Sequence, residues 1–541
     1  MCYYYRNEVR TMTKKKQPNL IKQFDKRTGN TYFYESIAYW DSEKKQSRAK
    51  RKLVGKLDPE TGKMVPTDGR MKKKKTTAVS MPLLTEIKRS FYGATYTLSQ
   101  LAKEVGLTED LKAMFPDDYQ ALLGLAYYLV LAPSSSMQKF NQWAELHHLP
   151  FDLSSLTSQR ISELFQRITE KEKQAFFKAQ VARQSEESYW FYDTTTISSY
   201  SQKLRQVQYG YNKEDDLLAQ LNLALLFGSE SRLPVLYRPL AGNIPDAKTL
   251  PWLMSLFDEL TDRPIQLVLD RGFYKAENIL LMCREGITFI QGAKVSLKYV
   301  KEALSQLAPT MEHLQHYDGA TNLYRQQLTI NQVFKASETS GYPVTLHAYL
   351  NSERATEERI RFHKQLQDWE RELQTNHLIE AHQKAYNTYF KVTKEKGKVV
   401  SVSMKDEAIA EKLAYAGYFV LLSNSRMTRA QVLSHYRDKD QVEKAFMNLK
   451  DRLNMRRLRV SSERGLEGKI FVQYLALILV SELKRRMEQA NLFKEHTLDE
   501  VLEAFNRIEC FVHPSFGMTI GEILQKQEVL FESLRIKIPP R

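Results

Sequence analysis

The order of hydrophobic patterns between residues 188 and 294 is the strongest constraint on the fold of this chain. Short apolar or alternating runs, typical of strands, give way twice to apolar residues at helical spacing. The expected strands cover residues 189–193, 217–225, 233–237, 265–270 and 288–291, and the expected helices cover residues 247–260 and 276–284. Three strands followed by helix, strand, helix and strand predict a mixed α/β sheet.

The rest of the chain divides around this core by composition. Lysine runs and short aromatic strands predict a small basic β-rich module ending in a disordered linker near residues 65–80, and residues at helical spacing follow it. A long polar helix near 352–383, with β-like pieces around it, predicts a β-rich and helical insertion into the core. The expected boundaries are 1–80 for the module and linker, 81–187 for a helical domain, 188–294 for the first part of the core, 295–415 for the insertion, 416–464 for the second part of the core, and 465–541 for a C-terminal helical region.

Positive charge is concentrated at the N-terminus. Residues 1–80 contain 21 Lys and Arg against 8 Asp and Glu, so they carry +13 of the net charge of +16. A second excess lies between Arg426 and Arg459, where ten basic residues accompany four acidic ones. Such clusters favour a polyanionic partner, because phosphate binding releases condensed counterions. A solvated basic arm without a partner is the alternative for residues 1–80.

The cysteine pattern and the length of the apolar runs predict the cellular compartment of the protein. Cys2, Cys283 and Cys510 are far apart and form no C-x-x-C pair, which excludes a zinc ribbon and a redox motif and favours a reducing cytosol. The N-terminus lacks the apolar segment of a secretory signal. The longest apolar runs, at 121–132 and 470–480, are shorter than the about 18 residues that a membrane span needs. We therefore expect a cytoplasmic protein without a membrane partner.

Two carboxylates each end an expected strand. Asp193 ends the run YWFYD, and Asp270 ends the run IQLVLD. If those strands are neighbours, both acids project from the same edge of the sheet, where α/β proteins usually bind ligands and metals. A turn or a helix cap is the alternative for either acid taken alone.

A third carboxylate lies on the helix expected from 428 to 453. At ~100° per residue, Tyr436, Glu443 and Lys450 are seven residues apart and stay on one face of that helix. A separate apolar row that can bury against the sheet comprises Val442, Phe446, Leu449 and Leu453. Glu443 is therefore expected at the rim of the buried face.

These residues resemble a known family. Tyr436, Lys439, Glu443 and Lys450 are similar to the Y-x2-R-x3-E-x6-K signature of bacterial transposases in the insertion-sequence-four superfamily. The signature arginine is Lys439 here, which keeps the charge but loses the planar bidentate fork of arginine.

The two strand-end acids extend the resemblance. Asp193 in YDTTT and Asp270 in LVLDRGF look like the first and second acids of the DDE triad of that family. Between them, GNIPD at 242–246 is similar to its GN-x-x-D stretch, and the resemblance covers about 188–480.

The resemblance implies an RNase-H-like core in which Asp193, Asp270 and Glu443 are the catalytic acids and hold two Mg2+ ions, with Mn2+ as a substitute. Carboxylate oxygens suit hard Mg2+, and two ions can activate a water or a 3′-hydroxyl and stabilise the leaving oxygen. The 173-residue step from Asp270 to Glu443 is long for this fold, and the insertion at 295–415 accounts for it.

The implied function is a DNA transposase of an insertion sequence. It would bind the terminal inverted repeats, cleave the DNA strands in a metal-dependent reaction and transfer them to a target by a cut-and-paste route. Its partners would be double-stranded DNA of the element ends and the target, and a second copy in a synaptic homodimer, at the nucleoid of a bacterial cytoplasm. The basic module and the helical domain at 81–187 would read the element ends.

Several side chains near the third acid are candidates for holding DNA phosphates. They are Tyr436, Lys439, Lys450, Arg426, Arg429, Arg456, Arg457 and Arg459. If the ends pass through hairpins, an extruded base needs an aromatic support. Trp369 and Tyr389 are candidates for it, although a core or surface role is the more common one for such residues.

Two other functions compete with this one. A phosphatase of the haloacid-dehalogenase type also ends a strand on a nucleophilic aspartate, but it requires a second Asp two residues later, where this chain has Thr195. A catalytically retired DNA-binding protein descended from a transposase is the other alternative. All three acids are present, and only Lys439 departs from the signature.

Overall fold

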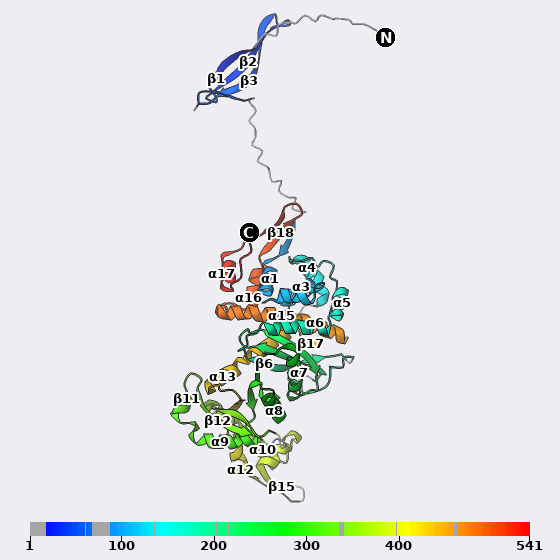
Figure 1. Ribbon diagram of the computed structural model, residues 1–541, viewed down its shortest axis with the longest axis vertical. Helices are drawn as coiled ribbons and strands as arrows, with labels where there is room; N and C mark the ends of the chain where they lie inside the picture. Colours follow the sequence, from blue (N-terminus) through cyan, green and yellow to red (C-terminus); the bar gives the residue numbers. More distant parts are fainter. Residues whose placement is uncertain are drawn as a thin grey trace. The chain divides into compact units, whose positions relative to one another are not determined.

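The structure is a computed structural model that describes residues 18–59, 61–67, 87–133, 136–201, 203–213, 217–334, 340–395, 398–458, 460 and 462–540. The chain separates into two compact units, residues 1–87 and residues 88–541 (Figure 1). Each unit is described by itself.

The N-terminal unit is an antiparallel sheet whose strands follow one another in sequence order. Its strands are β1 (Asn19–Asp25), β2 (Asn30–Asp41), β3 (Gln46–Leu57) and β4 (Met64–Pro66). β4 lies where the sequence predicts the start of a linker, and residues 68–86, which include most of that expected linker, are outside the described residues.

A mixed sheet organises the second unit. The described strands, in their spatial order, are β11 (Tyr317–Asp318), β12 (Leu323–Gln332), β13 (Tyr342–Leu350), β16 (Tyr418–Ser423), β10 (Thr288–Ala293), β9 (Gln266–Leu269), β6 (Trp190–Ser199), β7 (Gln220–Gly228) and β8 (Pro234–Ala241). A short further strand, β17 (Arg457–Leu458), pairs in parallel with the end of β6.

The centre of this sheet has the predicted element order. β6, β7 and β8 form an antiparallel meander, β9 is parallel to β6, and β10 is parallel to β9. The helices between them are α7 (Leu250–Leu260) and α8 (Ala276–Arg284). The mixed α/β sheet expected from the sequence is therefore confirmed.

Two details of the strand prediction are wrong. β6 does not end at Asp193 but continues to Ser199, because the β-branched residues Thr194–Ile197 remain extended and buried. β7 begins at Gln220, and Leu217, expected in this strand, is 93% exposed.

The expected insertion does not stand apart from the sheet. β12 and β13 join it through β16, which pairs with both β13 and β10. The remaining elements of this region are α9 (Lys298–Met311), α10 (Ser352–Gln374), α11 (Gln383–Tyr389), α12 (Asp406–Leu413), β14 (Phe390–Glu395) and β15 (Lys398–Met404). The long helix expected at 352–383 ends at Gln374, and the side chains of α10 and α11 form a small separate core around Phe362 and Tyr386.

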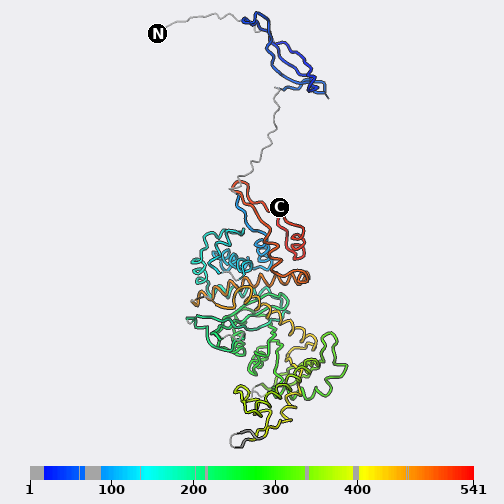
Figure 2. Tube along the Cα trace, turned by 180° about the vertical axis from the view of Figure 1, so that it is seen from behind, coloured from blue at the N-terminus to red at the C-terminus, as the bar shows by residue number. Residues whose placement is uncertain are grey.

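The two helical regions predicted at the N-terminal and C-terminal sides of the core pack together. The orange C-terminal segment lies against the cyan helices in Figure 2. The first region contains β5 (Lys88–Phe91), α1 (Gly93–Glu104), α2 (Leu107–Met114), α3 (Tyr119–Leu131), α4 (Phe140–Leu146), α5 (Ser158–Arg167) and α6 (Glu170–Ala182). The second contains α15 (Glu463–Gln489), α16 (Leu498–Asn506), β18 (Glu509–His513), β19 (Gly517–Ile520) and α17 (Gln525–Ser533).

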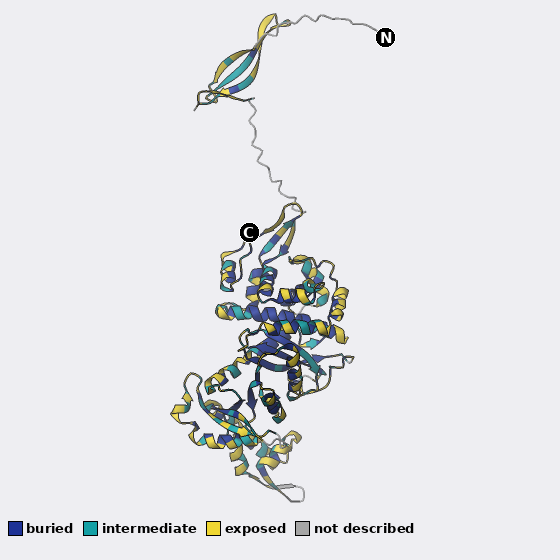
Figure 3. Ribbon diagram, in the orientation of Figure 1, coloured by how far each residue is buried: buried dark blue, intermediate teal, exposed yellow. Residues whose placement is uncertain are grey.

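Helix α15 is the centre of this packing. Its residues Ile470–Val480 are buried on all sides, and the helix appears mostly dark blue in Figure 3. An apolar run interrupted only by Gln473 predicts this burial. No helix among the described residues is long and apolar enough to cross a membrane.

The helix predicted from 428 to 453 is broken. It consists of α13 (Arg429–Asp438), α14 (Asp440–Met447) and a π-helical turn, Asn448–Arg452. The N–H of Lys439 bonds to the carbonyl of Tyr436, a 3₁₀-type bond, and the N–H of Leu453 bonds to the carbonyl of Asn448. Tyr436 lies before the first irregularity, Glu443 lies between the two, and Lys450 lies within the π-helical turn.

Candidate active site

Strand register brings Asp193 and Asp270 together. Tyr192 of β6 lies opposite Leu269 of β9 in a parallel pair, and each acid is the next residue along its chain. Side chains at the same level of neighbouring strands point to the same face of a sheet. Tyr192 bonds to Thr249 beside α7, so the two acids point to the other face, which α13 covers.

The two acids differ in their electrostatic surroundings. Burial raises the pKa of Asp193 above its usual value, the ammonium groups of Lys213 and Lys439 oppose this, and the charge of Asp270 adds to the increase. Burial also raises the pKa of Asp270, but Lys439 and the hydroxyl of Tyr436 more than offset it, so the pKa of Asp270 is lowered. The two carboxylates are therefore close enough to interact as charges.

Lys439 connects the third acid to this pair. Its ammonium Nζ lies 2.8 Å from Oε1 of Glu443 and 3.9 Å from Oδ2 of Asp193. The Lys439 side chain is 7% exposed, whereas that of Glu443 is 56% exposed. Burial lowers the pKa of Lys439, but Asp193, Glu443 and Asp270 together outweigh it and raise that pKa. Lys439 is thus a buried cation surrounded by the three predicted acids.

Tyr436 fixes the orientation of Asp270. Its hydroxyl donates a 2.7 Å hydrogen bond to Oδ1 of Asp270, which also accepts a 2.8 Å bond from the N–H of Arg271. Gly292 of β10 leaves room for this contact, because a Cβ at that position would lie 2.9 Å from the Tyr436 hydroxyl oxygen and 2.8 Å from the Arg271 nitrogen.

The surroundings of Asp193 are completed by Thr194 and Asp246, which lie within the quoted sequence stretches, and by Lys213, which the sequence did not single out. Lys213 donates bonds of 2.7 Å and 3.0 Å to the carbonyl and hydroxyl oxygens of Thr194, and its Nζ lies 3.2 Å from Oδ2 of Asp246. Thr194 donates a 2.5 Å bond to Oδ1 of Asp246. The GNIPD stretch already contained Asp246, whereas no sequence pattern distinguishes Lys213.

A cavity of about 370 Å³ opens beside Asp193 and Glu443. Its lining includes Lys450 and Arg456, two of the predicted phosphate-binding residues. Arg456 pairs with Asp451 at 2.6 Å, and Lys450 is buried. The structure therefore brings acids and cations to the same opening.

A second cavity, of about 1180 Å³, borders Asp270 and Tyr436. It is lined by strands β10 and β16 on one side and by α10 and α12 on the other. Tyr389 lies in its wall and stacks on Trp369, with ring centroids 5.9 Å apart. Both aromatic residues proposed as base supports thus pack in the small core around α10.

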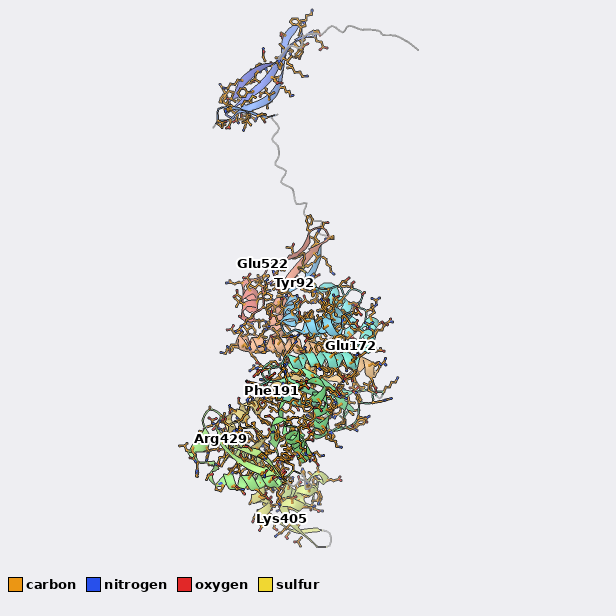
Figure 4. The ribbon with its side chains drawn as sticks, viewed as in Figure 1. Tyr92, Glu172, Phe191, Lys405, Arg429 and Glu522 are labelled. Atoms are coloured by element: carbon orange, nitrogen blue, oxygen red, sulfur yellow. The ribbon has the colours of Figure 1, made fainter. Side chains whose placement is uncertain are left out.

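The other predicted DNA contacts lie elsewhere. Arg457 donates a hydrogen bond to the hydroxyl of Tyr200 and stacks on its ring, 5.0 Å from the centroid. Arg426 and Arg429 lie at the opposite end of α13 from Tyr436, and Figure 4 labels Arg429 at the edge of the unit and Phe191 of β6 in its interior. The charge of Arg429 acts on His347 rather than on the acids. Arg459 is outside the described residues.

The three acids do not form a ready three-ligand metal site. Within the described ranges, no three Asp, Glu, His or Cys side chains are grouped so that they could hold a metal ion. The Asp193–Asp270 pair nevertheless fits a divalent cation, because it offers hard oxygen donors whose mutual repulsion such an ion would relieve. The ammonium of Lys439 supplies that neutralising charge here.

Comparison with known proteins identifies a family for this chain. The sequence model of the family described as "Transposase DDE domain" matches residues 185–479, which contain all three acids. No curated protein matches the chain. Among solved structures, the chain is similar to a piggyBac transposase in a synaptic complex with hairpin DNA, with 10% identity, a TM-score of 0.34, and coverage of 76% of this chain and 70% of that chain.

The matched range is continuous and spans more than half of the 541 residues. It begins just before β6 and ends within α15, so it includes the whole sheet and the helices that carry Tyr436, Lys439 and Glu443. On this match, the chain belongs to the transposase DDE-domain family.

Proposed function

We propose that this protein is a DNA transposase of an insertion sequence, of the insertion-sequence-four type, that cleaves the ends of its element and transfers the strands to a target by a cut-and-paste route. The observation that carries the proposal is the placement of Asp193 and Asp270 side by side on parallel strands, with Glu443 joined to them through Lys439. Phosphodiester chemistry with two divalent ions requires carboxylates that lie close enough together to share those ions.

The topology supports an RNase-H-like core for this chemistry. The spatial order β8-β7-β6-β9-β10, with an antiparallel meander followed by two parallel strands, has the acids on its two central neighbours, β6 and β9. On this proposal, residues 188–294 and 416–464 are the two parts of the core, and residues 295–415 are its insertion.

Asp193, Asp270 and Glu443 would hold the divalent ions, two Mg2+ with Mn2+ as a substitute, and the ions would polarise the scissile phosphate and activate the attacking hydroxyl. The protein's own side chains prepare this site. Tyr436 orients Asp270, and Lys439 neutralises the buried acids. Lys450 and Arg456 lie at the same opening, where cations can bind the phosphates that flank the scissile bond.

Double-stranded DNA of the element ends and of the target is the proposed partner. A homodimer would hold two terminal inverted repeats in one synaptic complex. The basic N-terminal unit would bind DNA outside the acids, because residues 1–80 carry +13 of the net charge of +16. The helices at 81–187, with 11 Lys and Arg against 13 Asp and Glu, would contact the element ends without adding net positive charge.

A cleavage assay tests the proposal. The full-length protein is incubated with duplex DNA that carries the terminal repeats flanking its gene, with Mg2+, with Mn2+ and with EDTA. We expect strand cleavage at the repeat ends with either metal and none in EDTA. Binding to the repeats without cleavage under every metal condition would instead support a catalytically retired DNA-binding protein.

A further inference from the structure

The N-terminal unit has almost no interior of its own. Of its described residues, only Ser36 and Gly55 are buried, and its strands are largely exposed and half-buried in Figure 3. A small sheet gains stability in water only when an apolar face is covered. A partner that covers one face of this sheet would supply the missing burial.

Strand register divides the side chains of this sheet into two faces. Ile37 of β2 lies opposite Lys50 of β3, and Tyr39 lies opposite Arg48, so these four share one face. Leu20 of β1 lies opposite Glu35, two residues from Ile37, and therefore lies on the same face, as does Phe24. We call the surface formed by Leu20, Phe24, Ile37, Tyr39, Arg48 and Lys50 the open face.

The open face combines exposed apolar groups with cations. Leu20 and Phe24 are 58% and 60% exposed, and Ile37 and Tyr39 are 46% and 47% exposed. Exposed apolar side chains grouped on one surface mark a binding site more often than scattered ones do. Their cross-strand partners, Arg48 and Lys50, are exposed as well. The same face also carries Glu35 and Asp41, and Asp41 pairs with Arg48 at 3.3 Å, so a phosphate would compete with Asp41 for Arg48.

The opposite face is different. There, Tyr34 and Leu53 lie opposite one another and are half-buried, and Ser36 is buried. The exposed large apolar side chains of this face, among the described residues, are Trp40 at the hairpin end, 67% exposed, and Val65 of β4, 43% exposed. The two faces therefore differ most in their exposed apolar surface.

Duplex DNA fits the open face in charge and in size. Residues 18–67, which contain the sheet, hold 11 Lys and Arg against 6 Asp and Glu, an excess that favours phosphate backbones over neutral or basic partners. The major groove, about 12 Å wide, admits a two-stranded β-ribbon, and β2 and β3, whose axes lie about 4.8 Å apart, carry Ile37, Tyr39, Arg48 and Lys50.

We propose that the open face docks in the major groove of duplex DNA. Arg48 and Lys50 bind phosphates at its edges, and Ile37 and Tyr39 contact the base edges, where apolar groups meet the methyl groups of thymine. This inference rests on the proposed transposase function, since it identifies a second surface by which the same protein holds its DNA.

Neighbouring residues on opposite faces provide a matched test. The full-length double variant Tyr39→Ser/Lys50→Glu changes the open face, and Trp40→Ser/Arg51→Glu makes the same change in charge and removes one aromatic ring from the other face. Affinity for a labelled mixed-sequence duplex is measured in EDTA over a series of salt concentrations. We expect the first variant to bind about tenfold more weakly with a log–log salt slope smaller by about 1, and the control to bind within about twofold of wild type.

Three results would overturn the inference. Equal losses in both variants would assign the effect to overall charge rather than to the open face. A changed self-association of the first variant in sedimentation, with unchanged DNA affinity, would assign the face to a second copy of the chain. Wild-type affinity in both variants would show that the N-terminal unit does not bind DNA. The proposed function would not be affected by that result, because Mg2+-dependent cleavage of the terminal repeats tests it separately. Protease digestion of both variants verifies folding, and Lys50→Gln repeats the test if the double variant is cleaved within residues 18–67.

Discussion

The hydroxyl of Tyr436 donates a 2.7 Å hydrogen bond to Oδ1 of Asp270, although 166 residues separate them in the sequence. The bond links helix α13 to the end of strand β9, and it fixes one oxygen of a carboxylate that the proposed function uses as a metal ligand. Gly292 beneath it has no side chain to displace the ring.

Replacing Tyr436 with Phe should reduce cleavage without unfolding the protein. A hydrogen bond to a charged acceptor contributes about 1.5–3 kcal/mol, so we expect cleavage to fall about tenfold or more, with thermal stability close to wild type. Tyr299→Phe, which removes a 3.0 Å bond to Tyr274 away from the acids, is the matched control. Equal activity of Tyr436→Phe and wild type would show that this contact does not position Asp270.

Replacing any of the three acids should greatly reduce DNA cleavage while leaving DNA binding almost unchanged. Asp193→Asn, Asp270→Asn and Glu443→Gln each lose a proposed metal ligand, worth several kcal/mol of transition-state stabilisation, so cleavage should fall about 1000-fold or more. Duplex affinity in EDTA should change little, because it depends on many phosphate contacts elsewhere. Asp440→Asn, which affects an exposed acid paired with Lys444 on the same helix as Glu443, is the control. Cleavage within tenfold of wild type in any of the three would remove that residue from the triad.

The Lys439 side chain should contribute most to the stability of the protein when no divalent ion is present. Removing one partner of a buried ion pair costs about 3–5 kcal/mol, so Lys439→Gln should lower the melting temperature clearly in EDTA. Added Mg2+ should restore more stability to this variant than to wild type, because the ion then supplies the charge that the ammonium provided.

Lys444→Gln is the control for Lys439. Its ammonium forms an exposed pair with Asp440, so its loss should have little effect on stability. If Mg2+ shifts the melting temperature of Lys439→Gln and wild type equally, the ammonium and the metal do not share one site.

Lys213 and Asp246 should support catalysis although the sequence did not distinguish Lys213. Lys213→Met removes the contacts to Thr194 and Asp246 beside the first acid, and we expect cleavage to fall about tenfold through kcat, since about 1.4 kcal/mol is tenfold in rate. Lys203→Met, an exposed lysine of the same connection, is the control. A change in DNA affinity alone would indicate phosphate binding by Lys213 instead.

His347 should make the second unit less stable in mild acid. It is fully buried in β13, and burial together with the nearby charge of Arg429 lowers its pKa to about 4. The unfolded chain binds the proton at about pH 6.5, so stability should be complete above that pH and decline towards pH 4, by up to about 3 kcal/mol. His347→Leu should reduce this decline in thermal unfolding measured against pH, whereas His377→Gln, at an exposed position, should not. A decline of equal size in His347→Leu and wild type would exclude His347 as its source.

The sequence predicted the parts of the site that depend on local pattern. The element order from β6 to β10 and the strand-end position of Asp270 follow from apolar runs and a helical period, which are local properties. The end of β6 was predicted wrongly because a run of threonines suits both a turn and a buried strand.

Long-range contacts could not be predicted in this way. The break at Lys439 and the π turn after Met447 leave no signature in composition. The joining of β12 and β13 to the main sheet depends on β16, which is far away in the sequence. The placement of Lys213 beside Asp193 depends on the path of the loop before β7.

The pairing of β5 with β18 has a consequence for synthesis of the protein. Residues 88–91 of one strand hydrogen-bond to residues 509–512 of the other, and α15 packs against α3 and α5 between them. A ribosome must therefore have completed most of the chain before its first helices find their permanent neighbours. We expect a product truncated after Glu443 to contain all three proposed acids but to lack α15 and β18, the elements against which the first helices and β5 pack.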